Sequence, residues 1–159
     1  MSRPLKLGFM SELRSTGQRK SDVLASLAEN RDMWLATSSP TGRPHMIAVS
    51  SWWDGKQVVI ATIGTSRTAR NLDATGLGRF ALGSPDDVVM IDVRVLDSVP
   101  VHHADPLLAA GFAAAAGWNP LEEAGSWKFF RLTPLEVQAY RGYGELQGRQ
   151  VMHDSQWLE

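Results

Sequence analysis

The sequence predicts a mainly β fold, an antiparallel barrel with helices inserted between its strands. Short runs rich in β-branched and aromatic residues follow one another with turn residues between them, which is typical of strands joined by hairpins. The few helical segments interrupt this series rather than alternate with every strand, so a doubly wound parallel sheet is disfavoured. The chain has 159 residues, a length that suits one domain with a substantial core.

The amino-acid composition argues against several classes of protein. Lys and Arg total 16 against 17 Asp and Glu, and the resulting net charge of -1 disfavours a nucleic-acid-binding protein. The chain has no Cys, which excludes a disulfide framework and a thiolate metal site and suits a reducing cytoplasm. We find no apolar run of the ~20 residues that a membrane span needs, and residues 1–15 lack the apolar run of a signal peptide. We therefore expect a cytoplasmic protein with no membrane partner.

The first twenty residues differ in character from the rest. They mix Arg, Lys, Ser and Gly with no sustained period, and we expect an arm (1–20) that lies on the domain or on a partner subunit. A single domain then covers 21–159. It opens with a predicted helix that Ser21 or Asp22 caps and that Asn30 ends, with apolar residues at helical spacing between them.

A hairpin is the clearest local prediction. Strand 33–37 is followed by a turn and a second strand, 43–53, which leads to Asp54 and Gly55. That dipeptide favours a two-residue type I′ turn, in which both positions need a positive φ. The return strand is predicted at 57–62.

Strands and two further helices fill the rest of the chain. One helix runs from Ser66 to about Ala74, and another, capped by Asp105, ends at Gly117. The Gly-rich stretch 76–78 is interpreted as a turn. The remaining strands are predicted at 80–82, 88–96, 127–132 and 135–140, with a short one at 151–152 and a docked Trp157 and Leu158 at the end.

The start of the helix at Ser66 carries an unusual charge pattern. Arg67 and Arg70 lie three residues apart and so share one face, among the hydroxyls of Thr65, Ser66 and Thr68. Because free N–H groups make a helix start electropositive, cations there oppose the helix dipole unless an anion binds. A phosphate satisfies N–H groups, hydroxyls and guanidinium groups together. The alternative is a solvated basic helix whose arginines pair with Asp73, Asp86 or Asp87.

The second strand offers a different kind of surface. From Pro44 to Ser50 it presents backbone amides beside Met46 and Ala48, and an extended strand can hydrogen-bond the edge of a heterocycle through its main chain. On periodicity alone an ordinary barrel strand explains it better. The aromatic residues Trp52, Trp53, Trp118 and Trp127 either wall a ligand cleft or fill the core or a dimer interface.

Six short motifs occur in a fixed order. They are 34–37 (WLAT), 41–45 (TGRPH), 52–55 (WWDG), 60–62 (IAT), 66–72 (SRTARNL) and 79–82 (RFAL). Together they resemble the pyridoxamine 5′-phosphate oxidase-like split-barrel flavoprotein family over about 33–97, and the closing strand 127–140 also fits. The resemblance implies a six-stranded antiparallel split β-barrel, a homodimer, and flavin sites at the dimer interface.

The resemblance also implies which residues bind the cofactor. Thr62, Ser66, Arg67, Arg70 and Asn71 correspond to positions that hold the phosphate and ribityl chain, and the strand from Met46 to Ser50 lies against the isoalloxazine ring. With the neighbouring candidates, the predicted cofactor-binding set is Met46, Ile47, Ala48, Val49, Ser50, Thr62, Ser66, Arg67, Thr68, Arg70, Asn71 and Trp127. Members that use the deazaflavin coenzyme F-420 often have a Lys where this chain has Thr68 and Ala69. The C-terminal substrate signature of true pyridoxamine-phosphate oxidases is not matched.

These observations favour an FMN-dependent oxidoreductase that acts on a small organic substrate. An F-420-dependent reductase of the same fold and a non-catalytic flavin-binding or redox-sensing module are the alternatives. We predict no metal site, because the four His are accompanied by no Cys and show no metalloprotease spacing. No Ser lies in a G-x-S-x-G elbow, and no catalytic side chain is assigned.

Overall fold

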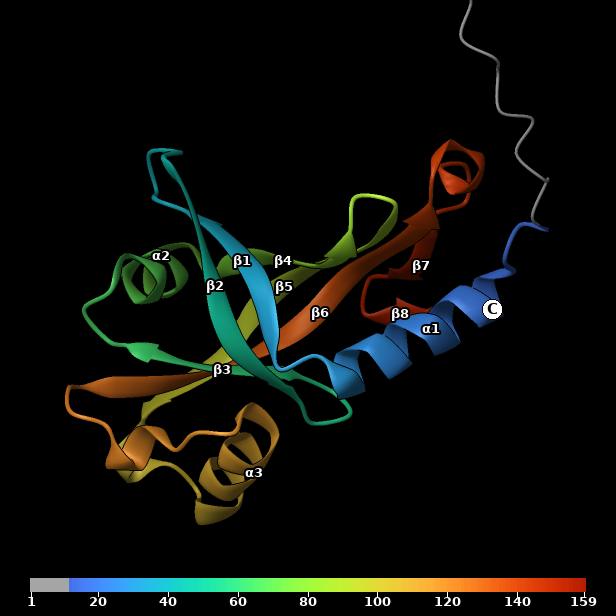
Figure 1. Ribbon diagram of the computed structural model, residues 1–159. Helices are drawn as coiled ribbons and strands as arrows, with labels where there is room; N and C mark the ends of the chain where they lie inside the picture. The colour runs from blue at the N-terminus through green and yellow to red at the C-terminus, as the bar shows by residue number, and fades with distance from the viewer. Residues whose placement is uncertain (1–11) are drawn as a thin grey trace, which may run out of the picture.

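The computed structural model describes residues 12–159. Six antiparallel strands form a closed barrel in the order β3-β2-β1-β4-β5-β6, because β3 and β6 also pair with each other (Figure 1). The barrel strands are β1 (Asp32–Ser38), β2 (Pro44–Trp53), β3 (Val58–Ile63), β4 (Leu77–Ser84), β5 (Asp87–Pro100) and β6 (Trp127–Arg141). Two short strands, β7 (Gln150–His153) and β8 (Gln156–Trp157), extend the sheet beyond β6. The predicted six-stranded antiparallel split barrel is confirmed.

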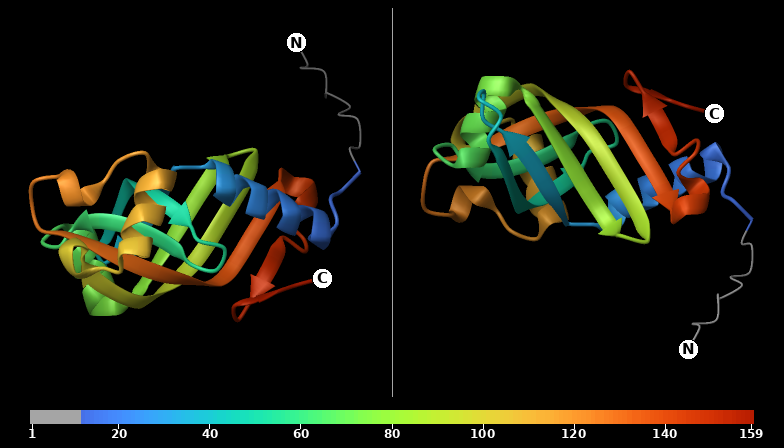
Figure 2. Two further views of the ribbon diagram at one scale, coloured as in Figure 1. Left: turned by 90° about the horizontal axis from the view of Figure 1, so that it is seen from below. Right: turned by 90° about the horizontal axis from the view of Figure 1, so that it is seen from above.

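Within residues 12–159, three α-helices surround the barrel. They are α1 (Thr16–Glu29), α2 (Arg67–Thr75) and α3 (Pro106–Ala116), and the short 3₁₀ turns are η1 (Val101–His103), η2 (Pro120–Glu122) and η3 (Tyr143–Glu145). Figure 2 shows α1 running beside the C-terminal strands, where it contacts β7. In the part of the chain that the structure describes, no helix is both long and apolar enough to cross a membrane.

The core has two parts. Alternate residues of the barrel strands point inward, and Leu35, Ile60, Phe80 and Phe130 are fully buried there. A second cluster lies outside β3 and β6, where Val59, Ala61 and Phe129 pack beneath Phe112 of α3. Since α3 covers this second surface, both faces of β3 are buried.

Helix α3 lies unusually close to β2. A Cβ atom added at Gly111 would overlap the ring of Trp52, so the helix reaches this position only because residue 111 has no side chain. The helix itself is bounded as predicted: Asp105 caps its first turn by accepting a hydrogen bond from the Leu107 N–H at 2.8 Å, and Gly117 ends it with φ of 80°.

The first helix begins earlier than predicted. It starts at Thr16 instead of after Ser21, because the Ser15 hydroxyl caps it by accepting a hydrogen bond from the Gln18 N–H at 3.1 Å. The first helical turns are polar, and this polarity hid them in the sequence. Part of the predicted arm is therefore helical, whereas residues 1–11 lie outside the described part of the chain.

The predicted type I′ turn at Asp54 and Gly55 is wrong. The Asp54 N–H donates to the Gln57 carbonyl at 3.1 Å, which places Gly55 and Lys56 at the centre of the turn, and only Gly55 has a positive φ. The reason is that the Asp54 carboxylate accepts the N–H groups of Lys56 and Gln57 and so holds Asp54 ahead of the turn.

Several other boundaries also differ. Gly76 is the C-cap of α2, with φ of 69°, so Leu77 and Gly78 already belong to β4 and do not form a turn. The strands predicted at 127–132 and 135–140 are one continuous strand, β6, because Pro134 is accommodated opposite Val93 at a register shift.

The C-terminal hairpin contains a two-residue turn that was not predicted. Asp154 and Ser155 both have positive φ, of 47° and 62°, the signature of a type I′ turn between β7 and β8. Beyond it, Trp157 packs against the core as predicted, while Leu158 is exposed.

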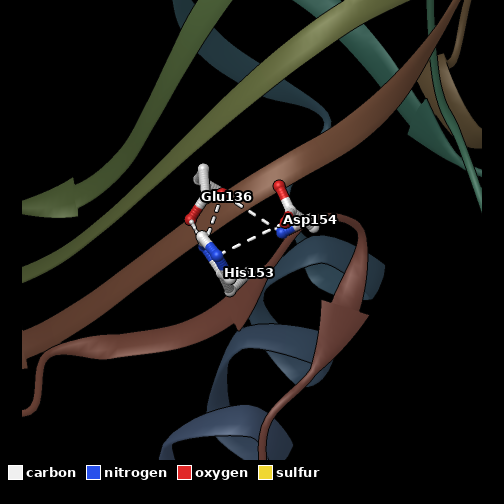
Figure 3. A group of neighbouring side chains, drawn as sticks. All are labelled: Glu136, His153 and Asp154. Carbon is white, nitrogen blue, oxygen red and sulfur yellow. Dashed lines mark hydrogen bonds and ion pairs between the residues drawn. The ribbon is translucent and has the colours of Figure 1, made fainter.

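Glu136 of β6 holds this hairpin in place (Figure 3). Its carboxylate accepts the Asp154 N–H at 3.1 Å and lies 2.9 Å from His153 Nδ1. The Asp154 hydrogen bond lowers the pKa of Glu136, and the hydrogen bond from His153 to Glu136 raises the pKa of the imidazole. His153, isolated in the sequence, is thus part of a small charged cluster with Glu136 and Asp154.

An ion pair at the C-terminal end of β6 is buried. The Arg14 guanidinium donates to Glu145 at 2.7 Å through Nη2 and at 3.1 Å through Nε, and the Arg141 N–H donates to the same carboxylate at 2.8 Å. These hydrogen bonds, led by that of the Arg14 side chain, lower the pKa of Glu145 to about 2. The segment before α1 is thereby joined to the end of β6.

Glu145→Gln is expected to destabilise the protein by about 3 kcal/mol at neutral pH, because it removes the buried partner of Arg14 and leaves the partly exposed Asp22 as its nearest carboxylate. The native carboxylate has a lowered pKa, so its stabilising effect is complete above its ordinary value of 4.5 and is lost as the pH falls toward about 2. Urea unfolding at several pH values should show that the difference in unfolding free energy between the native protein and the variant decreases in that range. Glu29→Gln, at the exposed end of α1, is the control and should change little.

The C-terminal hairpin should be best ordered in mildly acidic solution. Its His153 contribution is present below the ordinary imidazole pKa and is lost as the pH rises through the raised value, while that of Glu136 is lost in acid. Hydrogen exchange of the hairpin amides, corrected for intrinsic rates, should show greater protection at pH 5.5 than at pH 8.5. His153→Gln should remove this difference, and His103→Gln should preserve it.

Candidate functional site

The barrel is split between β2 and β3. Residues 44–50 of β2 pair with β1 only, and β3 meets β2 only at Ser51, Trp52 and Trp53. On its other edge β3 pairs with β6 along its whole length, from Val58 to Ile63. Within the described chain, one backbone edge of residues 44–50 therefore has no strand beside it.

Helix α2 follows β3 directly and stands at this split (Figure 1). Ser66 is its N-cap: the Ser66 hydroxyl accepts the Ala69 N–H at 3.1 Å and lies 3.1 Å from the Thr62 hydroxyl. The next two N–H groups, of Arg67 and Thr68, have no carbonyl partner within a helix, so they are available to an anion at this end.

The two predicted arginines carry charges that no carboxylate neutralises. Arg67 and Arg70 are both exposed, and Arg70 Nε donates to the Thr65 carbonyl at 3.0 Å. Over residues 12–159 neither arginine forms an ion pair. Two of the three acids that the alternative interpretation named bind elsewhere: Asp73 pairs with Lys128 at 2.9 Å and Asp87 pairs with Arg141 at 3.0 Å, while Asp86 forms no ion pair with either arginine in the described chain.

Two other predicted residues face the barrel rather than solvent. Thr68 and Asn71 are 2% and 5% exposed. The Thr68 hydroxyl lies 3.2 Å from His45 Nε2 on β2, and Asn71 Nδ2 donates to the Thr37 hydroxyl on β1 at 3.1 Å. These hydrogen bonds fix α2 to two strands, so the barrel sets the position of the arginines.

The predicted segment of β2 has two different faces. Val49 points into the core, whereas Met46 and Ala48 are exposed on the outer face, Met46 at 64%. Ile47, on the barrel side, is 43% exposed, and Ser50 donates to Asp32 at 3.1 Å. The outer face continues onto β1, where Trp34 lies opposite Ala48 and is 54% exposed.

Trp127 lies on a different side from the arginines. Its ring packs against Trp118, with centroids 5.0 Å apart, in the cluster beneath α3, and its Nε1 donates to the Ala124 carbonyl at 3.0 Å. A pocket of about 430 Å³ nevertheless joins Trp127 to Gly64, which precedes α2 in the chain.

Sequence reasoning missed two residues at this site. Lys128 lies opposite Thr62 in the β3–β6 register and binds Asp73 of α2, and His45 contacts Thr68. No local pattern signals either contact, because each joins residues that only the strand pairing brings together.

The known proteins that this chain resembles are found among solved structures. No protein-family model and no curated protein matches the sequence. A solved structure described as F420 Reductase has a TM-score of 0.58 at 20% identity, over 70% of this chain and 93% of that chain. A pyridoxamine 5′-phosphate oxidase-related, FMN binding protein from Nostoc punctiforme PCC 73102 has a TM-score of 0.55 at 14% identity, over 82% and 87%. HutZ, a heme storage protein from Vibrio cholerae, has a TM-score of 0.58 at 13% identity, over 87% and 99%.

These similarities confirm the fold that the sequence motifs resemble. The chain has the split barrel found in FMN-binding proteins related to pyridoxamine 5′-phosphate oxidase. The neighbours are described as an F420 reductase, an FMN binding protein and a heme storage protein, and one fold hosts many functions, so the fold alone does not assign a function to this chain.

Proposed function

We propose that this protein is an FMN-dependent oxidoreductase that transfers hydride or electrons to or from a small organic substrate. The observation that carries the proposal is the pair of arginines, Arg67 and Arg70, exposed and unneutralised at the start of α2. A phosphate bound there removes the conflict between the two cations and the helix dipole. No carboxylate of the described chain competes for the site.

The residues at the split also suit the rest of a flavin. Thr62 and Ser66 present hydroxyls beside the helix start. The free backbone edge of β2 between Met46 and Ser50 offers N–H and C=O groups to the polar edge of a flat ring. Thr68 and Asn71, on the side of α2 that faces the barrel, hold the helix in place through His45 and Thr37.

The flavin, when bound, supplies the redox chemistry. The chain binds the phosphate, orients the ring along β2 and excludes water from one side of it. Because the flavin supplies the chemistry, no side chain has to act as an acid, a base or a nucleophile.

A second copy of the chain completes the site. Trp34, Met46 and Ala48 form an exposed apolar face beside the split, and an apolar face of this kind is typical of a subunit interface. A homodimer that buries this face closes the open side of the flavin site.

Replacing Arg67 and Arg70 together by Ala is expected to weaken FMN binding by at least about 100-fold, because each charge-assisted hydrogen bond to a phosphate contributes about 1.5–3 kcal/mol. Riboflavin, which has no phosphate, should bind equally to the native protein and the variant. Titration calorimetry measures both ligands. Arg94→Ala, an exposed arginine on β5, is the control; equal FMN affinity in the native and double-variant proteins contradicts the proposal.

The identity of the cofactor is tested by mass spectrometry of the small molecule released from the purified protein by heat. FMN is expected; the deazaflavin would support the F-420-dependent alternative, which the similarity to F420 Reductase favours. Oxidation of the reduced cofactor by a panel of acceptors then tests catalysis. Full occupancy without any turnover would support the non-catalytic binding module instead.

Trp34→Glu is expected to convert the dimer to a monomer, because it places a charge at the centre of the proposed interface. Sedimentation velocity measures the change, and FMN affinity should fall with it. Leu107→Glu, at a residue 81% exposed on α3, is the control and should remain dimeric. A native protein that sediments as a monomer at high concentration would contradict the proposed interface.

A further inference from the structure

A buried arginine of the first helix has no partner. Arg19, in the second turn of α1, is 7% exposed, and its Nε and Nη1 atoms are fully buried without a hydrogen bond. Within residues 12–159 its guanidinium forms no ion pair either. Burying an unpaired charge is unfavourable, so the position of Arg19 points to a counter-charge that binds there.

The acids on the neighbouring elements are already bound. Asp22, one helical turn after Arg19, accepts a hydrogen bond from Arg14 Nη1 at 2.8 Å. Glu145 of η3 accepts hydrogen bonds from the Arg14 side chain at 2.7 Å and from the Arg141 N–H at 2.8 Å. Residues 1–11 contain no Asp or Glu. The charge of Arg19 is therefore not neutralised by its own helix or by η3.

The third nitrogen of the guanidinium, Nη2, lies at an open place beside Gly148, in the loop between η3 and β7. A Cβ atom added at Gly148 would lie 3.8 Å from Nη2 and, apart from the chain neighbours of Gly148, would meet no other atom within 4 Å. An oxygen atom of a small anion fits this space at hydrogen-bond distance from Nη2. Gly148 has φ of 73°, a conformation that favours glycine, so no side chain fills the space.

The surroundings of this space are positively charged. Lys20 lies over the ring of Trp157, 5.7 Å from its centroid, and Arg149 donates to the Gln138 side chain at 3.2 Å and to the Leu146 carbonyl at 2.9 Å. In the described chain, neither cation pairs with a carboxylate. The first turn of α1 also has no acidic residue, so the electropositive helix start is not offset. This end of α1 therefore favours an anion.

We propose that Arg19 binds a phosphate-type oxyanion beside Gly148. Nη2 donates to one oxygen of the anion, and the negative charge compensates the buried guanidinium. Because Arg19 belongs to α1 and Gly148 precedes β7, the bound anion joins the first helix to the C-terminal hairpin. The site is separate from the proposed flavin site, since α1 and α2 lie at opposite ends of the barrel (Figures 1 and 2).

Inorganic phosphate is the probe for the test. The starting protein is the full-length Arg67→Ala, Arg70→Ala double variant, which lacks the arginines of the proposed flavin site. Calorimetric titration at neutral pH and constant ionic strength should show one phosphate per chain. Adding Arg19→Met should weaken phosphate binding at least about 10-fold, because a charge-assisted hydrogen bond is lost. Adding Arg94→Met instead, at an exposed arginine of β5, is the control and should change nothing.

The melting temperature provides a second readout, which also shows that the variant folds. Without phosphate, Arg19→Met should raise the melting temperature, because an apolar side chain replaces an unpaired buried charge. Saturating phosphate should raise the melting temperature of the starting protein and leave that of its Arg19→Met variant unchanged. A melting temperature that Arg19→Met lowers in the absence of phosphate would mean that Arg19 already has a partner, and would overturn the proposal.

Gly148→Asp and Gly148→Asn are a matched pair of variants. Asp and Asn have similar shapes and both tolerate a positive φ, but only Asp is charged. In Gly148→Asp the new carboxylate should take the place of the anion, so phosphate should bind at least about 10-fold more weakly than in Gly148→Asn. Equal phosphate affinity in these two variants, equal affinity with and without Arg19→Met, or no phosphate binding by the starting protein overturns the proposal.

Discussion

The break in hydrogen bonding between β2 and β3 is the constraint on which the site depends. A fully paired barrel has no free backbone edge, but here β3 leaves β2 after a short contact and continues along β6. The chain then turns into α2, whose first turn stands at the opening. One topological feature thus creates both an unpaired strand edge and a helix start, the two elements that a phosphorylated flat ligand requires.

Burial and charge are divided between the two faces of α2. Its inner face places Ala69 and Leu72 in the core and hydrogen-bonds Thr68 and Asn71 to two strands, which costs little because each polar group finds a partner. Its outer face carries the arginines. Asp73, the one acid of the helix, is bound by Lys128, so the positive potential at the helix start is preserved.

Local signals in the sequence were sufficient for much of the fold. Asp105 and Gly117 bounded α3 correctly because capping depends on neighbouring residues. By contrast, Glu145 and Arg14 are 131 positions apart, and Asp73 and Lys128 are 55 apart, so no window of sequence shows either pair. Trp127 was predicted among the cofactor-binding residues; that its ring packs toward α3 could not be read from the strand period, which does not say which face of β6 points toward α3. The first turns of α1 are polar, so no apolar periodicity revealed this part of the helix in the sequence. The same polar segment contains Ser15, which caps the helix.

The close approach of α3 to β2 at Gly111 restricts how this protein can vary. Even alanine at that position forces the helix away from Trp52, and only Ala104 and Asp105 separate the helix from η1, whose His102 and His103 line the pocket that also contains Gly64 and Trp127. A side chain there would therefore reshape a wall of the pocket from a distance. Among homologues that keep this helix, we expect glycine at 111 to vary together with the size of the aromatic residue at 52.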